Sequence, residues 1–312
     1  IGGFLATSGM ITIGGIQAIL QYMQNISQPM GEAANMMGLT QSMLAAAERI
    51  FELLDAEEME EETGKPALPE VHGDVTFKHV SFGYTPEVQL MKDLNIDVKA
   101  GETVAIVGPT GAGKTTVINL LMRFYDITGG SIEIDGHNIQ DYTKESLRSK
   151  VGMVLQDTWL FKGTIRENIR YSRQDATDEE VVAAAKQAFA DDFIRKLPKG
   201  YDTVITEESD NISQGQKQLL TIARAILASP SVFILDEATS NVDTRTEVEI
   251  QKAMDHIMTN KTSFVIAHRL STIRNANKIL VMQKGNVIEQ GSHDELIAQN
   301  GFYAGLYRAQ FE

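Results

Sequence analysis

The sequence lacks cysteine altogether among its 312 residues, which excludes a disulfide framework and thiolate chemistry. Basic residues are scarce relative to acidic ones, with 28 Lys and Arg against 42 Asp and Glu and a net charge of −14. Nucleic-acid-binding surfaces need an excess of positive charge, so this balance argues against a nucleic-acid partner. The length is sufficient for one large domain with its own core and an additional segment.

Charge is also missing from the first 31 residues, and Glu32 is the first charged side chain. This segment has neither a basic n-region nor a small-residue cleavage site, which argues against a signal peptide. The sequence starts without a methionine, so we expect it to be a piece of a longer protein.

Residues 14–54 are predicted to form one long helix. Apolar residues follow one side of it and glutamines recur at spacings of four, three and four: Ile16, Ile19, Leu20, Met23, Ile26 and Met30, and Gln17, Gln21, Gln24 and Gln28. A membrane span needs about 20 predominantly apolar residues. Glutamines are tolerated there only against other helices or a water-filled cavity. The residues alone therefore leave two interpretations open, a transmembrane helix or an amphipathic helix of a soluble protein.

Three parts of the chain are separated by composition. An acidic run at 55–62 leads into a stretch rich in Gly and Pro, which predicts a solvated linker. We therefore divide the chain into residues 1–57, a linker at 58–72 and a main domain at 73–312. In the main domain, apolar alternation predicts strands from Val75 to Phe82 and around Leu94 to Val98. Residues 143–227 are expected to be mostly helical.

Residues 108–115, Gly-Pro-Thr-Gly-Ala-Gly-Lys-Thr, fit the phosphate-loop pattern Gly-x-x-x-x-Gly-Lys-[Ser/Thr]. A β-branched apolar run at 103–107 precedes the loop and predicts a buried strand. A helical pattern follows it, carried by Val117, Ile118, Leu121, Met122 and Tyr125. The loop therefore ends at a helix N-terminus, which favours anions. We expect Lys114 to reach the outer phosphates of a nucleoside triphosphate and the Thr115 hydroxyl to hold Mg²⁺.

Two carboxylates, Asp236 and Glu237, end the apolar run at 231–235, and His268 follows a second such run at 263–267. Runs of this kind are typical of strands buried in parallel sheets, whose carboxyl ends form the ligand edge. We expect Asp236 to hold Mg²⁺ through water and Glu237 to polarise the attacking water. His268 is expected to contact the γ-phosphate.

In this order the motifs resemble the nucleotide-binding domain of an ABC transporter of the exporter type, over essentially the whole chain. The resemblance implies an α/β P-loop NTPase fold with an antiparallel β subdomain and a helical subdomain, about residues 143–227. It implies that residues 1–57 are the last transmembrane helix and its cytoplasmic extension. ATP and Mg²⁺ are the implied cofactors, and the implied activity is ATP hydrolysis coupled to transport. The implied location is the plasma membrane, multi-pass, with the nucleotide-binding domain on the cytoplasmic side.

The resemblance also assigns roles to single residues. Tyr84 resembles the aromatic residue that stacks on adenine. The Walker A loop is implied to bind ATP through Gly108, Pro109, Thr110, Gly111, Ala112, Gly113, Lys114, Thr115 and Thr116. Gln156 resembles the Q-loop glutamine that touches Mg²⁺ and the attacking water, so that Glu237, His268 and Gln156 form the implied catalytic set. The implied metal set is Thr115, Gln156 and Asp236, and residues 240–243 resemble the D-loop.

The signature motif departs from the family pattern. Leu-Ser-Gly-Gly-Gln stands here as Ile-Ser-Gln-Gly-Gln at 212–216, so that Gln214 replaces a glycine. In this family the signature acts across a dimer on the ATP of the partner, which implies a role in trans for Ser213, Gln214, Gly215, Gln216 and Asp243. Glycine permits close backbone approach and positive φ, and a side chain can obstruct both. The run at 206–210 also lacks the Gly-Glu-Arg that is usual in exporters.

We interpret this departure as a sign of a heterodimer with one degenerate ATP site. The partner would be a second, non-identical ABC exporter subunit with an intact signature, which completes the competent site on this chain's Walker A loop. A homodimer that tolerates Gln214 is the alternative. The transported substrate is expected to be a small molecule, a lipid or a peptide, carried across a lipid membrane.

Other function classes fit less well. Chromosome-organising and DNA-repair ATPases use a similar head but need coiled-coil arms, and the interval from Thr116 to Ile212 has no sustained heptads. A soluble binding or regulatory module does not account for the uncharged first 31 residues or for Glu237.

Overall fold

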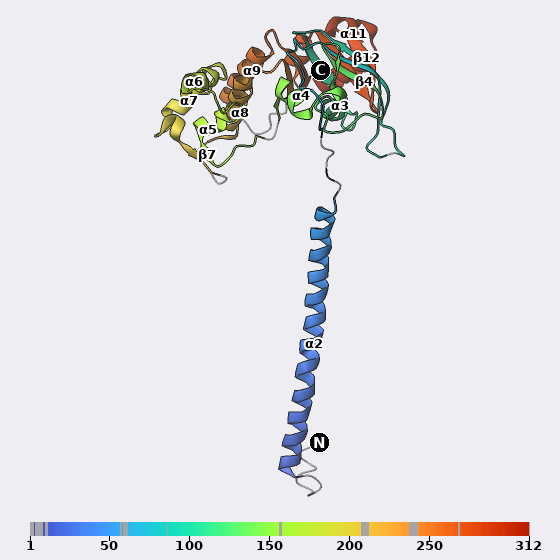
Figure 1. The fold of residues 1–312 in the computed structure, drawn as a ribbon, viewed down its shortest axis with the longest axis vertical. Helices are drawn as coiled ribbons and strands as arrows, with labels where there is room; N and C mark the ends of the chain where they lie inside the picture. Colours follow the sequence, from blue (N-terminus) through green and yellow to red (C-terminus); the bar gives the residue numbers. More distant parts are fainter. Residues whose placement is uncertain are drawn as a thin grey trace. The chain divides into compact units, whose positions relative to one another are not determined.

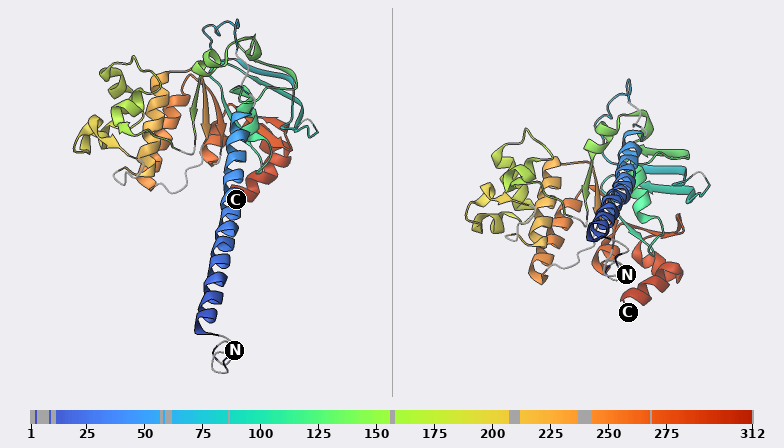
Figure 2. Two further views of the ribbon diagram at one scale, coloured as in Figure 1. Left: turned by 60° about the horizontal axis from the view of Figure 1, so that its bottom comes forward. Right: turned by 90° about the horizontal axis from the view of Figure 1, so that it is seen from below.

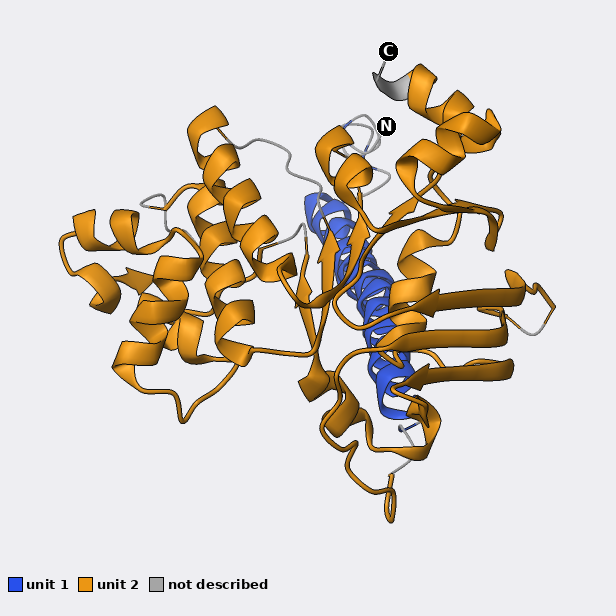
Figure 3. Ribbon diagram, turned by 90° about the horizontal axis from the view of Figure 1, so that it is seen from above, with its two compact units in different colours: residues 1–61 blue, residues 62–312 orange. Residues whose placement is uncertain are grey.

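The computed structural model describes residues 3, 9, 12–56, 58, 62–85, 87–155, 158–206, 212–236, 243–267 and 269–311. The chain divides into two compact units, residues 1–61 and residues 62–312 (Figure 3).

The described part of the first unit consists mainly of helix α2, Ile13–Leu54, which confirms the predicted long helix (Figure 1). The Thr12 hydroxyl accepts a hydrogen bond from the Gly15 N–H at 3.1 Å and caps the N-terminus. No residue of α2 is buried, and its apolar side chains, such as Leu20 and Met30, are exposed. Within the described part of the chain, no helix combines the length and the apolar character needed to cross a membrane.

The second unit is organised on a six-stranded sheet in the order β12-β11-β3-β10-β9-β6. Its strands are β3 Thr103–Val107, β6 Val151–Val154, β9 Val232–Asp236, β10 Thr262–Ile266, β11 Lys278–Gln283 and β12 Asn286–Gly291. All neighbours are parallel except β11 and β12, which form an antiparallel hairpin. The strands β3, β9 and β10 are buried on both faces, as their continuous apolar runs predict.

A second, antiparallel sheet has the order β2-β1-β4-β5. It consists of β1 Val75–Phe82, β2 Met91–Val98, β4 Gly129–Ile134 and β5 His137–Asn138. In β2 the buried residues include Leu94, Ile96 and Val98, whereas the intervening Asn95 and Asp97 are exposed. This alternation places one face of the sheet in the core and the other in water.

The helix after the phosphate loop, α3 Lys114–Leu121, buries five of its residues. Val117 and Leu121 belong to one apolar cluster together with residues of both sheets, such as Phe77 and Ile106. The helix is shorter than predicted, and Tyr125 lies beyond its end. The reason is that the chain turns at Arg123, which has a positive φ of 50°.

Helices gather at the other end of the second unit, away from the antiparallel sheet (Figures 2 and 3). They are α5 Ile165–Arg170, α6 Asp178–Gln187, α7 Asp191–Lys196 and α8 Gln214–Ala228, accompanied by the short strands β7 Gly163–Thr164 and β8 Val204–Ile205 and the 3-10 turn η2 Gly200–Asp202. Thr177 and Glu180 form a capping box at the start of α6, in a Ser/Thr-x-x-Glu/Gln sequence that is typical of helix N-termini.

The region at 143–227 is mostly helical, as predicted, but besides β7 and β8 it contains strand β6 at the edge of the central sheet, which the sequence did not predict. The remaining elements are η1 Ile139–Asp141, α4 Lys144–Lys150, α9 Thr244–Met258, α10 Leu270–Asn275, α11 His293–Gln299 and α12 Phe302–Phe311.

Most described residues of the predicted linker are exposed, but the part from Glu62 onward belongs to the second unit. Leu68 and Val71 are buried in its core. The Leu68 N–H donates a hydrogen bond of 2.9 Å to the Ser146 hydroxyl. Composition predicts the polarity of this stretch but not its two apolar anchors, which find their partners only in the folded unit.

Candidate nucleotide-binding site

The phosphate loop lies between β3 and α3, with its conformation set by glycines. Gly108, Gly111 and Gly113 have φ angles of 152°, 77° and 100°, a region that side chains disfavour. A Cβ atom on Gly108 would also lie only 2.3 Å from the carbonyl oxygen of Met282. The pattern of glycines in the motif is therefore required by the backbone path itself.

The loop rests on the turn of the β11–β12 hairpin. The Gly285 N–H donates a hydrogen bond of 2.8 Å to the carbonyl of Ala112, which is itself buried. Gly285 has a φ of 82°, and a Cβ atom there would lie 2.0 Å from the Leu90 carbonyl oxygen. Tertiary contacts thus hold the loop in position before any ligand contributes.

The start of α3 fits an anion. Its N-cap is Gly113, which offers no side-chain acceptor to the first N–H groups of the helix. Those groups and the helix dipole favour a phosphate at this point. Lys114, Thr115 and Thr116 form the first turn, so the structure places all nine predicted Walker A residues in the loop or in this turn. The donor set therefore fits the triphosphate of ATP.

Lys114 at the start of α3 and Asp236 at the end of β9 are brought close enough to interact electrostatically. The Lys114 ammonium donates hydrogen bonds to the carbonyls of Gly108 at 2.8 Å and Pro109 at 3.1 Å. Burial lowers the pKa of Lys114, and the nearby carboxylate of Asp236 partly offsets this effect. A carboxylate and the Thr115 hydroxyl beside a phosphate site are oxygen ligands of the kind Mg²⁺ prefers. These residues fit the ion, as the sequence predicts.

Tyr84 lies beside the phosphate-loop helix. Its hydroxyl is 3.0 Å from the Thr116 hydroxyl, and its ring is about half exposed. The ring of Phe82 meets it edge-on at 4.9 Å, and that of Tyr125 does so at 5.1 Å with an interplanar angle of 88°. The sequence did not predict the contact of Tyr125 with Tyr84, because the helical pattern predicted Tyr125 as part of α3.

The signature residues form the start of α8. The Ser213 hydroxyl accepts from the Gln216 N–H at 3.2 Å, and the Gln216 side-chain oxygen accepts from the Ser213 N–H at 3.0 Å. This capping box gives both retained residues a structural role. Gly215 is buried in the first turn.

Gln214 is the first residue of α8 and does not have a positive φ. Of the two obstructions expected from a side chain at this position, the one to a positive φ does not apply, because the backbone here is helical. The Gln214 amide donates a hydrogen bond of 2.8 Å to the Thr158 hydroxyl. What the substitution changes is the space and the contacts at the N-terminus of α8, rather than the backbone.

All three residues of the predicted catalytic set, Gln156, Glu237 and His268, lie outside the described residues, as do residues 240–242 of the D-loop. Asp243 is described, and its carboxylate accepts from the Thr246 N–H at 3.0 Å as the N-cap of α9. This backbone hydrogen bond lowers the pKa of Asp243.

Comparison with known proteins agrees with this geometry. Residues 91–240 match the family model described as ABC transporter. A solved bacterial Atm1-family ABC exporter with ATP bound superposes with a TM-score of 0.77 at 41% identity, covering 97% of this chain and 53% of that one. The chain carries an ABC transporter ATP-binding domain of the exporter type. Its α/β P-loop NTPase fold, with antiparallel and helical parts, is that of the ABC ATPases.

Two curated relatives are similar to this chain over about half of their own length. One is the uncharacterized ABC transporter ATP-binding protein YfiC of Bacillus subtilis, 54% identical over 100% of this chain and 52% of the relative. The other is the fatty acid ABC transporter ATP-binding/permease protein of Mycobacterium tuberculosis, 52% identical over 99% of this chain and 49% of the relative. The chain spans about half the length of these curated relatives.

Replacement of Tyr84 tests its place in the ATP site. Tyr84→Ala removes the stacking surface and is expected to weaken ATP binding about tenfold, since base–aromatic stacking contributes roughly 1–3 kcal/mol. Tyr84→Phe keeps the ring, loses only the contact with Thr116 and should bind ATP within about twofold of the parent protein. Calorimetric titration of the intact protein measures both. Equal ATP affinity in Tyr84→Ala and the parent would remove Tyr84 from the site.

Proposed function

We propose that this chain is part of an ABC exporter subunit that hydrolyses ATP to drive a substrate across the plasma membrane. The observation that carries the proposal is the meeting of the phosphate loop and Asp236 at one edge of the parallel sheet. This is the edge at which open α/β sheets bind ligands. The activity of the whole protein, its substrate and its partner are parts of this proposal.

The proposed division of labour combines the described positions of Lys114 and Asp236 with the roles that the family resemblance assigns to the remaining residues. Lys114 and the N–H groups of α3 bind the outer phosphates, and Thr115, Asp236 and Gln156 hold Mg²⁺. Mg²⁺, when bound, neutralises charge that develops on the phosphates. Glu237 polarises the attacking water, and His268 contacts the γ-phosphate. Since phosphoryl transfer needs mainly positioning and charge stabilisation, this short set of residues is sufficient.

We assign residues 1–57 to the C-terminal part of a transmembrane domain, with the ATP-binding domain on the cytoplasmic side. The support is the exposed apolar side of α2, which one chain alone leaves uncovered. Other helices of the same bundle would cover this side and the adjacent glutamines. The relative from Mycobacterium tuberculosis is named for fatty acids, and this favours a lipid among the substrate classes of a small molecule, a lipid or a peptide.

We further propose that the partner is a second, non-identical ABC subunit and that one of the two ATP sites is weak. The support is Gln214, whose side chain lies at the N-terminus of α8 where the family pattern has a glycine. The second candidate, a homodimer, is favoured by the intact capping box of Ser213 and Gln216 and by the ordinary backbone conformation at Gln214.

The carboxylate of Glu237 is the first residue to test. Glu237→Gln keeps the shape of the side chain but cannot polarise water, so steady-state ATP hydrolysis by the intact transporter should fall by about 100-fold or more. ATP should still bind and remain trapped. A steady-state ATP hydrolysis rate equal to that of the parent protein would contradict the assignment of Glu237 as the catalytic residue.

A second variant tests the asymmetry of the two sites. Gln214→Gly should raise hydrolysis at the site that the partner's Walker A loop forms with this signature, as measured by nucleotide trapping resolved for each site. Thr158→Val is the matched control, because it removes the hydrogen bond between Gln214 and Thr158 while residue 214 is still a glutamine. No redistribution of trapped nucleotide in Gln214→Gly would contradict the asymmetric model.

A further inference from the structure

The turn after α3 has an arginine where a glycine is usual. The Phe124 N–H donates to the Asn119 carbonyl at 2.9 Å and the Arg123 N–H to the Leu120 carbonyl at 3.0 Å. These two bonds make a Schellman motif, and Arg123 occupies its left-handed position with a φ of 50°. A residue with a Cβ atom is disfavoured there by roughly 1–2 kcal/mol. The retention of arginine at this cost points to a use of its side chain.

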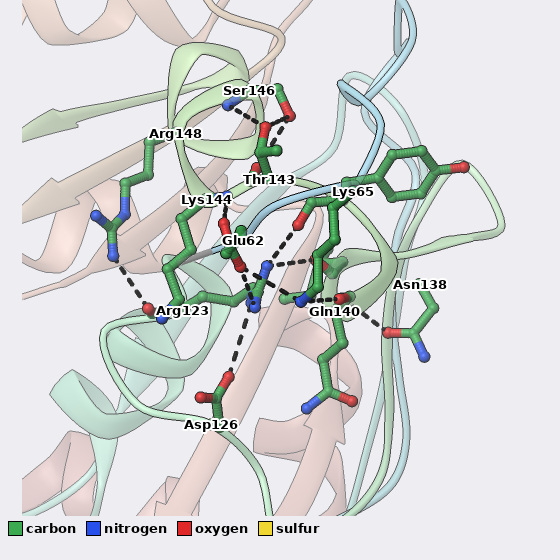
Figure 4. Close-up of polar contacts among 12 residues, drawn as sticks. Glu62, Lys65, Arg123, Asp126, Asn138, Gln140, Thr143, Lys144, Ser146 and Arg148 are labelled. Carbon is green, nitrogen blue, oxygen red and sulfur yellow. Dashed lines mark hydrogen bonds and ion pairs between the residues drawn. The ribbon is translucent and has the colours of Figure 1, made fainter. Parts of the chain in front are cut away.

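The Arg123 side chain is buried, and its two terminal nitrogens form hydrogen bonds, whereas its Nε lies 3.7 Å from the carboxylate of Asp126 (Figure 4). Its guanidinium donates to the carbonyls of Ile139 at 3.0 Å and Tyr142 at 2.7 Å, and to a carboxylate oxygen of Glu62 at 2.8 Å. The other oxygen of Glu62 accepts from the Lys144 N–H. Burial raises the pKa of Glu62, but the bond from Lys144 and the charge of Arg123 outweigh it and lower the pKa overall.

A second arginine holds the same turn from α4. Arg148 donates to the carbonyl of Met122 at 3.2 Å and to that of Arg123 at 3.0 Å, and its guanidinium lies 5.0 Å from the centre of the Phe124 ring (Figure 4). A cation at this position also stabilises the C-terminal end of the α3 dipole. We call Glu62, Arg123 and Arg148 the turn clasp.

Tyr125, which follows Arg123 and Phe124 in the chain, contacts Tyr84 at the nucleotide site. Arg123 contacts Glu62, Phe124 contacts Arg148, and Tyr125 meets the ring of Tyr84 edge-on. Three consecutive side chains therefore join the turn clasp to the aromatic residue assigned to adenine.

We propose that the turn clasp positions Tyr84, through Tyr125, for stacking on the base of ATP. The inference rests on the proposed function, since it requires that Tyr84 contact the base. Glu62 is the first residue of the second unit and follows α2 closely in the sequence. The position of the segment that carries Glu62 and the affinity for ATP are therefore linked. By reciprocity, ATP binding strengthens the contact of Glu62 with Arg123 by the same factor.

The test compares ligands with and without a base on the intact protein. Glu62→Gln removes the charge that faces Arg123, and we expect ATP to bind about tenfold more weakly, a loss within the stacking contribution of one base. Inorganic triphosphate, which lacks the base, should bind within about twofold of the parent value. Glu70→Gln is the matched control and should leave ATP affinity unchanged. Glu70 is likewise paired with a basic residue, Lys150, but the Glu70 side chain is 96% exposed.

Two further variants separate positioning from general destabilisation. Tyr125→Leu leaves the ion pair of Glu62 and Arg123 intact and should reproduce the loss of affinity for ATP without a loss of affinity for triphosphate. In a Tyr84→Ala background, Glu62→Gln should cause no additional loss. Equal weakening of ATP and triphosphate by Glu62→Gln, or unchanged ATP affinity in it and in Tyr125→Leu, would overturn the inference. Unchanged ATP affinity in Tyr84→Ala alone would instead overturn the proposed role of Tyr84.

Discussion

The parallel register of three central strands is the constraint on which the site depends. Ile266 of β10 lies opposite Ile106 of β3 on one side and Asp236 of β9 on the other. The strands therefore end at one level, and the phosphate loop that follows β3 begins at the same sheet edge as the carboxylate that ends β9, with β10 between them. Continuous apolar sequences hold this register, because both faces of the sheet are covered. A shift of one strand by a residue would separate Lys114 from Asp236 and remove the chemistry while keeping the fold class.

Around this edge, the loop is held by neighbours from distant parts of the sequence. The turn of the β11–β12 hairpin supports it from one side through Gly285, and α3 continues it into the core shared by the two sheets. The turn clasp then fixes the far end of α3 and the aromatic residues beside it. A preformed site of this kind spends little of its binding energy on ordering the loop. The same contacts make the segment after α2 part of the environment of the nucleotide.

Much of this could be predicted from the sequence, because its signals are local. The apolar runs of β9 and β10, the glycine pattern of the phosphate loop and the capping box of α6 each act over a few residues. Strand β6 was missed because it has only four residues between helical segments and includes Gly152. The burial of Leu68, the role of Arg123 and the contact of Gln214 with Thr158 could not be predicted, because each depends on a partner supplied by the folded chain.

The central claim is that the phosphate loop and Asp236 form one site for ATP with Mg²⁺. The most direct measurement is calorimetric titration of the intact protein with ATP, with and without Mg²⁺, for the parent protein and Asp236→Asn. The account predicts that Mg²⁺ tightens ATP binding in the parent, and that Asp236→Asn loses most of this gain but keeps its affinity for ATP alone. The same gain from Mg²⁺ in both proteins would contradict it.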